Sequence, residues 1–168
     1  MVAYLGLGSN LGDRSAEIGR AVQALSALGR VVAVSALYET EPEGAARQPR
    51  YINAVVRVET ELAARALLVA CLGIERARGR IRPADKRKAP RIIDIDLLLY
   101  GAEVLDEPGL TIPHPSLLAR PFVRIPLAEV ALPGLHHPQS GDALDRSEPD
   151  ATVRRVGYLP SASAGGCS

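Results

Sequence analysis

The sequence is poor in aromatic side chains: its 168 residues include no tryptophan and one phenylalanine, Phe122, and aromatic residues make up 4% of the chain. Proteins that bind single-stranded nucleic acid stack the bases on aromatic side chains. The most basic stretch of this chain, residues 76–91, contains none. The composition therefore does not favour a nucleic-acid partner.

Cysteine is also scarce, with single residues at positions 71 and 167. We expect Cys71 to lie on the apolar face of a helix, whereas Cys167 belongs to a terminal stretch of small residues. A structural disulfide is therefore not expected, and the two cysteines lack the spacing of a metal site.

Long apolar runs are absent as well. The longest, residues 66–74, is far shorter than the roughly 20 residues that a membrane-spanning helix needs. The chain opens directly on an apolar segment, residues 2–8, without the basic region of a signal peptide. Its net charge of +1 provides no general attraction to membranes or nucleic acids. We therefore expect a cytoplasmic protein with neither kind of partner.

The remaining composition fits one globular domain. A chain of 168 residues with 47% hydrophobic content can bury one sizeable core. We predict a single domain over residues 1–160 and a disordered tail over residues 161–168, where small residues predominate.

The apolar pattern predicts a β-α-β-β-α-β order. Strands are expected at residues 2–8, 31–38 and 51–60 and in the stretch 90–100. A first helix, with Ile18, Val22, Leu25 and Leu28 on one face, is expected to end at Gly29, and a second helix is expected at 62–78. Either Asn10 or Asp13 is expected to cap the first helix. This order is typical of an α/β (α+β) ferredoxin-like domain, an antiparallel sheet with both helices on one face.

A C-terminal extension follows the last of these strands. We predict a short strand at residues 103–105, broken by Pro108 and Gly109. Several prolines then permit only short helical pieces, at residues 116–119 and within 122–130.

Two carboxylates, Asp94 and Asp96, stand one residue apart in the last predicted strand. Alternate side chains of a strand point to opposite faces, so both aspartates share one face while Ile93, Ile95 and Leu97 face the core. Adjacent carboxylates resist burial unless a cation neutralises them. An oxygen-only pair suits Mg²⁺, whose shell substrate phosphates can complete. A surface strand whose acids pair with arginines would have the same sequence pattern.

Basic side chains cluster just before this strand, against a single acid, Asp85. They are Arg76, Arg78, Arg80, Arg82, Lys86, Arg87, Lys88 and Arg91. Because the cluster ends where the aspartate strand begins, cations and metal ligands converge, as the binding of a nucleoside triphosphate requires. The alternative is a solvated loop that contacts nucleic acid.

A glycine-rich turn spans residues 6–12. It resembles a phosphate-binding turn, but its last glycine is one residue too far for a dinucleotide fingerprint, and no Gly-Lys-Ser/Thr follows. We interpret it as a strand-turn-helix connection whose backbone touches a ligand.

Six motifs stand in one order along the chain: Gly8–Asp13, Tyr38–Pro42, Tyr51–Ala54, Glu75 with Gly79–Arg80, Ala89–Asp96 and Pro113–Pro115. Together they resemble the 6-hydroxymethyl-7,8-dihydropterin pyrophosphokinases of folate biosynthesis, over residues 2–130. The resemblance implies a Mg²⁺-dependent diphosphotransferase. Its substrates would be ATP and 6-hydroxymethyl-7,8-dihydropterin, and it would transfer the terminal diphosphate to the pterin hydroxymethyl group, leaving AMP.

The resemblance also implies site residues. The catalytic set is Arg80, Arg91, Asp94 and Asp96, of which the two aspartates would bind two Mg²⁺ ions. The ATP set is Glu75, Arg82, Thr111, His114 and Arg120. The pterin set is Thr40, Pro42, Tyr51, Asn53 and Phe122.

Other interpretations of single residues stay open. His114, between two prolines, can cap a turn, Glu75 can be a helix-surface acid paired with Arg78, and Phe122 can be a core residue. Three positions also depart from the family pattern, in which some members have tryptophan at Lys88, an aromatic residue at Pro115 and an arginine at Gly109. We therefore expect loop closure and ATP contacts to differ from those of such members.

Two other functions fit the same fold. One is a nucleotide-sensing or RNA-binding module without catalysis, and the other is an ordinary kinase, which would release ADP. Only the pyrophosphokinase makes AMP as the pterin is consumed. We expect a monomer.

Overall fold

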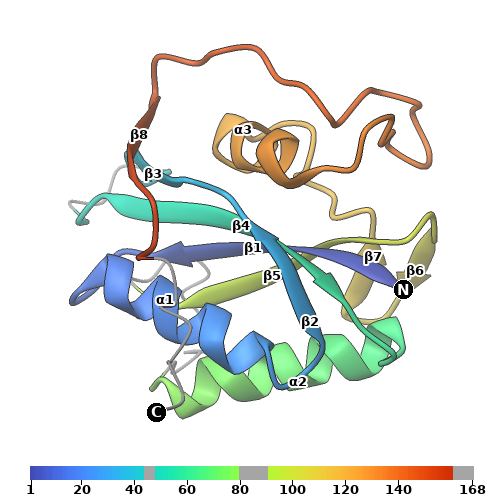
Figure 1. Ribbon diagram of the computed structural model, residues 1–168, viewed down its shortest axis with the longest axis horizontal. Coiled ribbons are helices and arrows are strands. Elements are labelled where there is room, and N and C mark those ends of the chain that lie inside the picture. Colours follow the sequence, from blue (N-terminus) through green and yellow to red (C-terminus); the bar gives the residue numbers. More distant parts are fainter. Residues whose placement is uncertain (44–47, 80–90, 161–168) are drawn as a thin grey trace, which may run out of the picture.

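The structure is a computed structural model that describes residues 1–43, 48–79 and 91–160 (Figure 1). In chain order the described elements are β1 (Val2–Ser9), α1 (Arg14–Leu25), β2 (Arg30–Val34), β3 (Leu37–Thr40), β4 (Tyr51–Glu59), α2 (Ala64–Ala77), β5 (Asp94–Tyr100), β6 (Leu105–Glu107), β7 (Leu110–Ile112), α3 (Pro121–Val130) and β8 (Val153–Gly157). The predicted β-α-β-β-α-β order and ferredoxin-like antiparallel sheet are confirmed.

One sheet of six strands forms the centre of the molecule, in the order β5-β1-β4-β3-β8, with β2 also paired to β4. Its neighbouring strands are antiparallel. Strand β1 lies between β4 and β5, and its Gly8 pairs with Asn53 on one side and with Asp94 on the other. The register therefore places the aspartate strand and the predicted pterin strand on either side of β1.

Helices cover both faces of this sheet. Figure 1 shows α1 and α2 on one face and α3 on the other. Because alternate side chains point to opposite faces, Leu5 packs in the core under α1 and α2, whereas Tyr4 packs under α3. Ile95 and Leu97 belong to the first core, as predicted, and Leu98 to the second. Asp94 and Asp96 therefore lie on the face that carries α3.

The single strand predicted at residues 31–38 is divided into β2 and β3. Its two halves both pair with β4, and between them the Ser35 N–H still donates to the Val55 carbonyl of β4 at 2.9 Å, whereas Ala36 bonds elsewhere. The Ser35 hydroxyl accepts the Val55 N–H at 2.9 Å, and the Ala36 N–H donates to the Glu129 carboxylate at 2.7 Å. A side chain from α3 thus takes a backbone donor that a continuous strand would use. The prediction was wrong at this point.

At the first helix, Asp13 is the cap: its carboxylate accepts the Ala16 N–H at 3.1 Å. The strand predicted at 103–105 lies two residues later, as β6, and forms a hairpin with the unpredicted β7. Residues 116–119 form a turn rather than a helix, and α3 confirms the helical piece within 122–130.

Strand β8 was not predicted, because its sequence is short and carries two adjacent arginines. No helix in the described part of the chain has both the length and the apolar character that crossing a bilayer requires. The predicted tail, residues 161–168, lies outside the described residues. The prediction of one domain over residues 1–160 stays a prediction.

Candidate active site

Asp94 and Asp96 stand at the start of β5, opposite two glycines of β1. Gly8 pairs with Asp94 and Gly6 with Asp96. A Cβ atom at Gly8 would lie 3.4 Å from the Asn53 Oδ1 atom. Glycine at these positions therefore keeps the surface of the sheet low between the carboxylates and β4.

A first cavity of about 340 Å³ opens above this part of the sheet. Its lining residues come from β1, β3, β4, β5, the start of α3 and the segment on either side of residues 44–47. They are Gly6, Leu7, Gly8, Thr40, Glu41, Pro42, Glu43, Gln48, Tyr51, Asn53, Ala54, Val55, Arg91, Asp94, Asp96, Arg120, Phe122 and Val123. The cavity thus brings together the complete predicted pterin set, both aspartates and Arg91.

Side chains that line this cavity contact one another and so hold each other in place. Asn53 is buried, and its Nδ2 donates to the Thr40 Oγ1 at 2.8 Å. The Arg120 guanidinium lies 5.6 Å from the centre of the Phe122 ring. Arg120, which we predicted as an ATP contact, therefore lies beside the predicted pterin residues and not apart from them.

Arg91 contacts both Asp94 and Asn10, which lies in the turn after β1. Its guanidinium forms an ion pair with the Asp94 carboxylate. Its backbone N–H donates to the Asn10 Oδ1 at 2.7 Å, and its carbonyl accepts the Asn10 N–H at 3.1 Å. Burial alone would lower the pKa of the Arg91 guanidinium, but the nearby Asp94, Tyr51 and Asp96 raise it. A fixed positive charge therefore stands beside the carboxylate pair.

The helix that carries Phe122 is held from its other end. The Glu129 carboxylate accepts the Tyr38 hydroxyl as well as the Ala36 N–H. Burial, with the neighbouring Glu129 charge, raises the pKa of Tyr38 to about 12. The hydroxyl thus stays protonated and donates, so α3 is tied to β3 at the end of the helix away from Phe122.

A second cavity of about 290 Å³ lies on the other side of the aspartate strand. Aliphatic side chains of α2, β5 and the β6-β7 hairpin line it together with the polar side chains of Asp96, Thr111 and His114. Its lining residues are Leu68, Leu72, Ile95, Asp96, Leu97, Gly109, Leu110, Thr111, His114 and Pro115. Two of the predicted ATP residues are here, and Asp96 lines both cavities.

His114 is fixed in one orientation. Its backbone N–H donates to the Leu98 carbonyl at 2.9 Å, and its ring Nδ1 accepts the Ser116 N–H at 3.1 Å. Burial and the Arg120 charge lower the pKa of the ring, which Asp94 partly opposes. The ring is therefore neutral near pH 7, and its proton stands on Nε2. His114 does take part in a turn, as one interpretation of the sequence held, but it also lines the second cavity.

Glu75 is almost completely buried, at 1% exposure, on the inner side of α2. Its Oε1 accepts the N–H of Ile95, the residue between the two aspartates, at 2.8 Å. The interpretation as a helix-surface acid is wrong, and Arg78 forms its ion pair with Glu17. Glu75 holds the backbone of the aspartate strand, and its proposed contact with ATP stays a prediction.

Two predicted site residues, Arg80 and Arg82, lie outside the described residues, with the rest of the basic segment up to residue 90.

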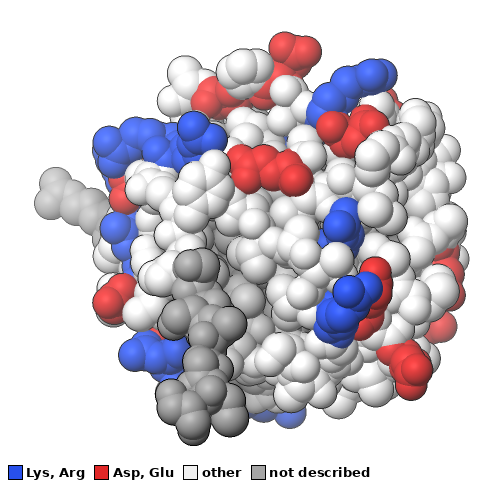
Figure 2. Space-filling view, viewed as in Figure 1, with Lys and Arg blue, Asp and Glu red and all other residues white. Residues whose placement is uncertain are grey.

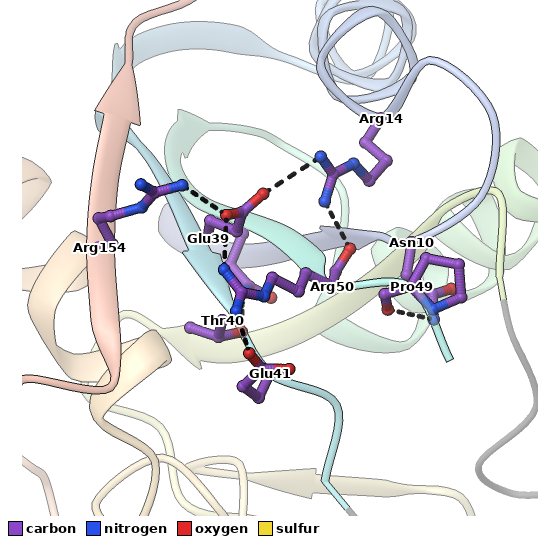
Figure 3. Close-up of polar contacts among 9 residues, drawn as sticks. Asn10, Arg14, Glu39, Thr40, Glu41, Pro49, Arg50 and Arg154 are labelled. Atoms are coloured by element: carbon purple, nitrogen blue, oxygen red, sulfur yellow. Dashed lines mark hydrogen bonds and ion pairs between the residues drawn. The ribbon is translucent and has the colours of Figure 1, made fainter. Parts of the chain in front are cut away.

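A cluster of arginines around Glu39 was not predicted from the sequence. Its carboxylate receives Arg154 at 2.8 Å, Arg14 at 3.2 Å and Arg50 at 3.5 Å, and Figure 3 shows these guanidinium groups around it. The hydrogen bond from Arg154 is the main cause that lowers the pKa of Glu39. Positions 14, 39, 50 and 154 have no spacing that a motif search would find, so only the fold reveals the cluster.

The family model of 7,8-dihydro-6-hydroxymethylpterin-pyrophosphokinase (HPPK) matches residues 4–132 of this chain. The chain belongs to this family. It is 51% identical over 132 residues to the 2-amino-4-hydroxy-6-hydroxymethyldihydropteridine pyrophosphokinase of Methylorubrum extorquens. The aligned region covers 77% of this chain and 82% of the relative. The chain is 45% identical over 130 residues to the protein of the same name from Pseudomonas aeruginosa, which covers 76% and 79%. The predicted resemblance is confirmed, and the chain is a member of an enzyme family.

Solved structures share the fold. A crystal structure of an HPPK-DHPS in complex with substrates matches with a TM-score of 0.64 at 16% identity, over 86% of this chain and 42% of that chain. The wild-type HPPK-DHPS of Plasmodium falciparum matches with a TM-score of 0.63 at 17% identity. This chain thus spans less than half the length of these solved chains. At 16–17% sequence identity, the structural likeness establishes the fold alone.

Proposed function

We propose that the protein transfers the terminal diphosphate of ATP to the hydroxymethyl group of 6-hydroxymethyl-7,8-dihydropterin and releases AMP, a step of folate synthesis. The observation that carries this proposal is the place of Asp96, which lines both cavities. A carboxylate at the junction of two cavities is suited to act where two substrates meet.

The donor set at this junction fits Mg²⁺. Within residues 1–43, 48–79 and 91–160, ligating side chains do not gather in groups of three or more, so the protein offers the two carboxylates of Asp94 and Asp96. Mg²⁺ binds through one or two carboxylates, keeps several waters and takes its other ligands from substrate phosphates. Bound there, two such ions would neutralise the phosphates and withdraw charge from the phosphorus under attack.

The first cavity suits a flat, polar heterocycle. Tyr51 and Phe122 provide rings against which a pterin can stack. Because the Asn53 Nδ2 donates to Thr40, its Oδ1 faces the space above Gly8 and can accept a ring N–H of the substrate. Pro42 lies at the rim. These contacts would place the hydroxymethyl group toward the aspartates.

The second cavity suits the nucleoside part of ATP. Leu68, Leu72 and Leu110 form an apolar wall for a base, while the Thr111 hydroxyl and the His114 Nε2–H are polar groups within the same cavity. The phosphates would then extend past Asp96. In this arrangement Thr111 and His114 keep their predicted roles in ATP binding.

The transfer itself needs positioning and charge stabilisation more than covalent chemistry. The hydroxymethyl oxygen attacks the β-phosphorus, and the bond from that phosphorus to the oxygen of the α-phosphate breaks, so AMP leaves with the bridging oxygen. The hydroxyl proton passes to solvent or to a phosphate oxygen. Arg91 and Arg120 line the cavity where negative charge moves, and the predicted Arg80 and Arg82 would add to them.

Incubation with ATP, Mg²⁺ and the reduced hydroxymethylpterin, followed by nucleotide analysis, tests the proposal. AMP formed in step with pterin consumption, and lost without Mg²⁺, supports it. ADP as the product would identify an ordinary kinase. Absence of both products while ATP binds would leave the nucleotide-sensing module, and either result would overturn the proposal.

Two observations count against the RNA-binding alternative. RNA-binding ferredoxin-like domains stack bases on aromatic side chains of an open sheet face. Here α3 packs over β4, as seen in Figure 1, and covers that face. Figure 2 shows acidic and basic side chains intermixed on the described surface that faces the viewer. The structure therefore favours small substrates.

We further propose that the protein acts as a monomer, as expected from the sequence. Sedimentation analysis at the concentration of the assay tests this: a dimer that dissociates with loss of activity would overturn it. The expected cytoplasmic location stays a prediction.

A further inference from the structure

The chain continues past the residues that the family model matches, and this continuation returns to the sheet. The match ends at residue 132, whereas β8, Val153–Gly157, pairs with β3. Figure 1 shows β8 beside β3 at the edge of the sheet. In the register, Arg154 stands opposite Glu39 and Val153 opposite Thr40. Strand β3 is thus held between β4 on one side and β8 on the other.

Glu39 connects β8 to two other parts of the molecule. Its side chain is 12% exposed, and the arginines that contact it come from α1, from the residue before β4 and from β8. The contact with Arg154 is the shortest, at 2.8 Å. Arg50 also reaches the Glu41 carboxylate at 2.5 Å, and its carbonyl accepts the Arg14 guanidinium at 2.7 Å. Figure 3 shows these contacts converging on the end of β3.

The residue after Glu39 points the other way. Alternation along β3 places Thr40 on the first cavity, where its Oγ1 accepts the Asn53 amide. Glu41 and Pro42 follow directly and also line that cavity. A displacement of the end of β3 would therefore move Thr40 and, with it, the Asn53 side chain that faces the pterin.

We propose that Arg154 is a positioning residue for the pterin: by pairing with Glu39 it fixes the end of β3, and thereby the Thr40–Asn53 pair of the first cavity. The proposal rests on the proposed function. The proposed role of β8 concerns the first cavity alone. The second cavity is lined by α2, β5 and the β6-β7 hairpin, so a displacement of β3 should not change it.

Arg155 offers a matched control, since it is the next residue on β8 and contacts Tyr158 instead of Glu39. For Arg154→Ala we expect the KM for the pterin to rise about two- to fivefold, the range of a partly exposed ion pair, while the KM for ATP stays within experimental error. Arg154→Glu should raise the pterin KM further, Arg154→Lys should restore part of the loss, and Arg155→Ala should change neither KM.

Two further measurements separate positioning from general stability. In a Glu39→Gln background, Arg154→Ala should have a smaller effect than in the wild type, because the ion pair is already lost and only a neutral hydrogen bond to the amide oxygen remains. Rising salt should bring the pterin KM of the wild type toward that of Arg154→Ala, because salt screens an exposed pair. Equal rises in both KM values, the same rise for Arg155→Ala, or an undiminished effect in the Glu39→Gln background would each overturn the inference.

The outcome is distinguishable from failure of the proposed function. A wild type that makes AMP, with Arg154 variants that match it in both KM values, refutes the role of Arg154 alone. A wild type that makes no AMP from the pterin refutes both.

Discussion

The two cavities that share Asp96 differ in the side chains that line them and in how these are held. The first has its floor on the central strands β1 and β4, and its polar groups already bond to one another, as Asn53 does to Thr40. The second lies between α2 and the β6-β7 hairpin, where aliphatic side chains stand beside Asp96, His114 and the exposed Thr111. A buried, preorganised polar pair rejects analogues that leave it unpaired. An exposed hydroxyl can bond to water when its ligand partner is missing, so it discriminates less. We therefore expect strict selection of the pterin and looser selection of the nucleotide base.

The largest effect should come from the residues at the junction. Asp96→Asn and Asp94→Asn keep the side-chain shape but weaken metal binding, so we expect kcat/KM to fall by at least about 100-fold with the thermal transition retained. Steady-state kinetics at fixed Mg²⁺ measure this. Asp142→Asn, an exposed aspartate outside both cavities, is the control. If either site variant kept near-parental activity, the assignment of Asp94 and Asp96 as Mg²⁺ ligands would be wrong.

A smaller, one-sided effect should come from the first cavity. Asn53→Ala leaves ring donors of the pterin and the Thr40 hydroxyl without their partner, at a cost of about 1 to 3 kcal/mol, or roughly ten- to hundredfold in the pterin dissociation constant. ATP binding should not change. Calorimetry with each ligand separately measures both constants, and Gln23→Ala, an exposed amide on α1, controls for the substitution. Equal losses for both ligands would make Asn53 a structural residue.

The corresponding experiment for the second cavity tests ATP binding. Thr111→Val removes a hydroxyl from an exposed strand position and keeps the branched shape, so the ATP dissociation constant should rise about two- to tenfold, the worth of one ordinary hydrogen bond. The pterin constant should stay at its wild-type value. Should the pterin constant rise instead, the assignment of substrates to cavities is reversed.

The smallest effect concerns pH. Burial lowers the pKa of His114 below its ordinary value of 6.5, so between these two values the unfolded chain binds more protons than the folded one. Stability should therefore rise with pH through this window and level off above 6.5. Denaturant titrations from pH 5 to 8 should show a shallower slope for His114→Asn, with His136→Asn, at an exposed position, as the control. An unchanged slope for His114→Asn would show that the ring does not titrate differently in the folded state.

The shared face of Asp94 and Asp96 was predictable, because side-chain alternation is a local property of a strand. The same rule placed Ile95 and Leu97 in the core. The division of residues 31–38 was not predictable, since the Ala36 N–H is taken by Glu129 from a helix more than 90 positions later in the chain.

The role of Glu75 was equally hidden. Glu75 stands four residues after Cys71, so its spacing places it on the buried face of α2, but only the packed structure shows that its carboxylate bonds to the Ile95 N–H. Arg120 was assigned to ATP by resemblance, yet its side chain lies over Phe122 in the first cavity. Local patterns identified the elements and the carboxylate pair, whereas contacts between distant segments required the fold.

The glycines of β1 have a consequence for the order of folding. Gly6 and Gly8 lower the intrinsic tendency of β1 to be extended, by roughly 0.5 to 1 kcal/mol each relative to alanine. Strand β1 is therefore held by its partners β4 and β5, which lie far from it in the sequence. Pairing of such distant segments is slow, because a long loop must close first. We therefore expect the floor of the first cavity to form late in folding, and a chain in which β5 has not yet paired with β1 to lack both cavities.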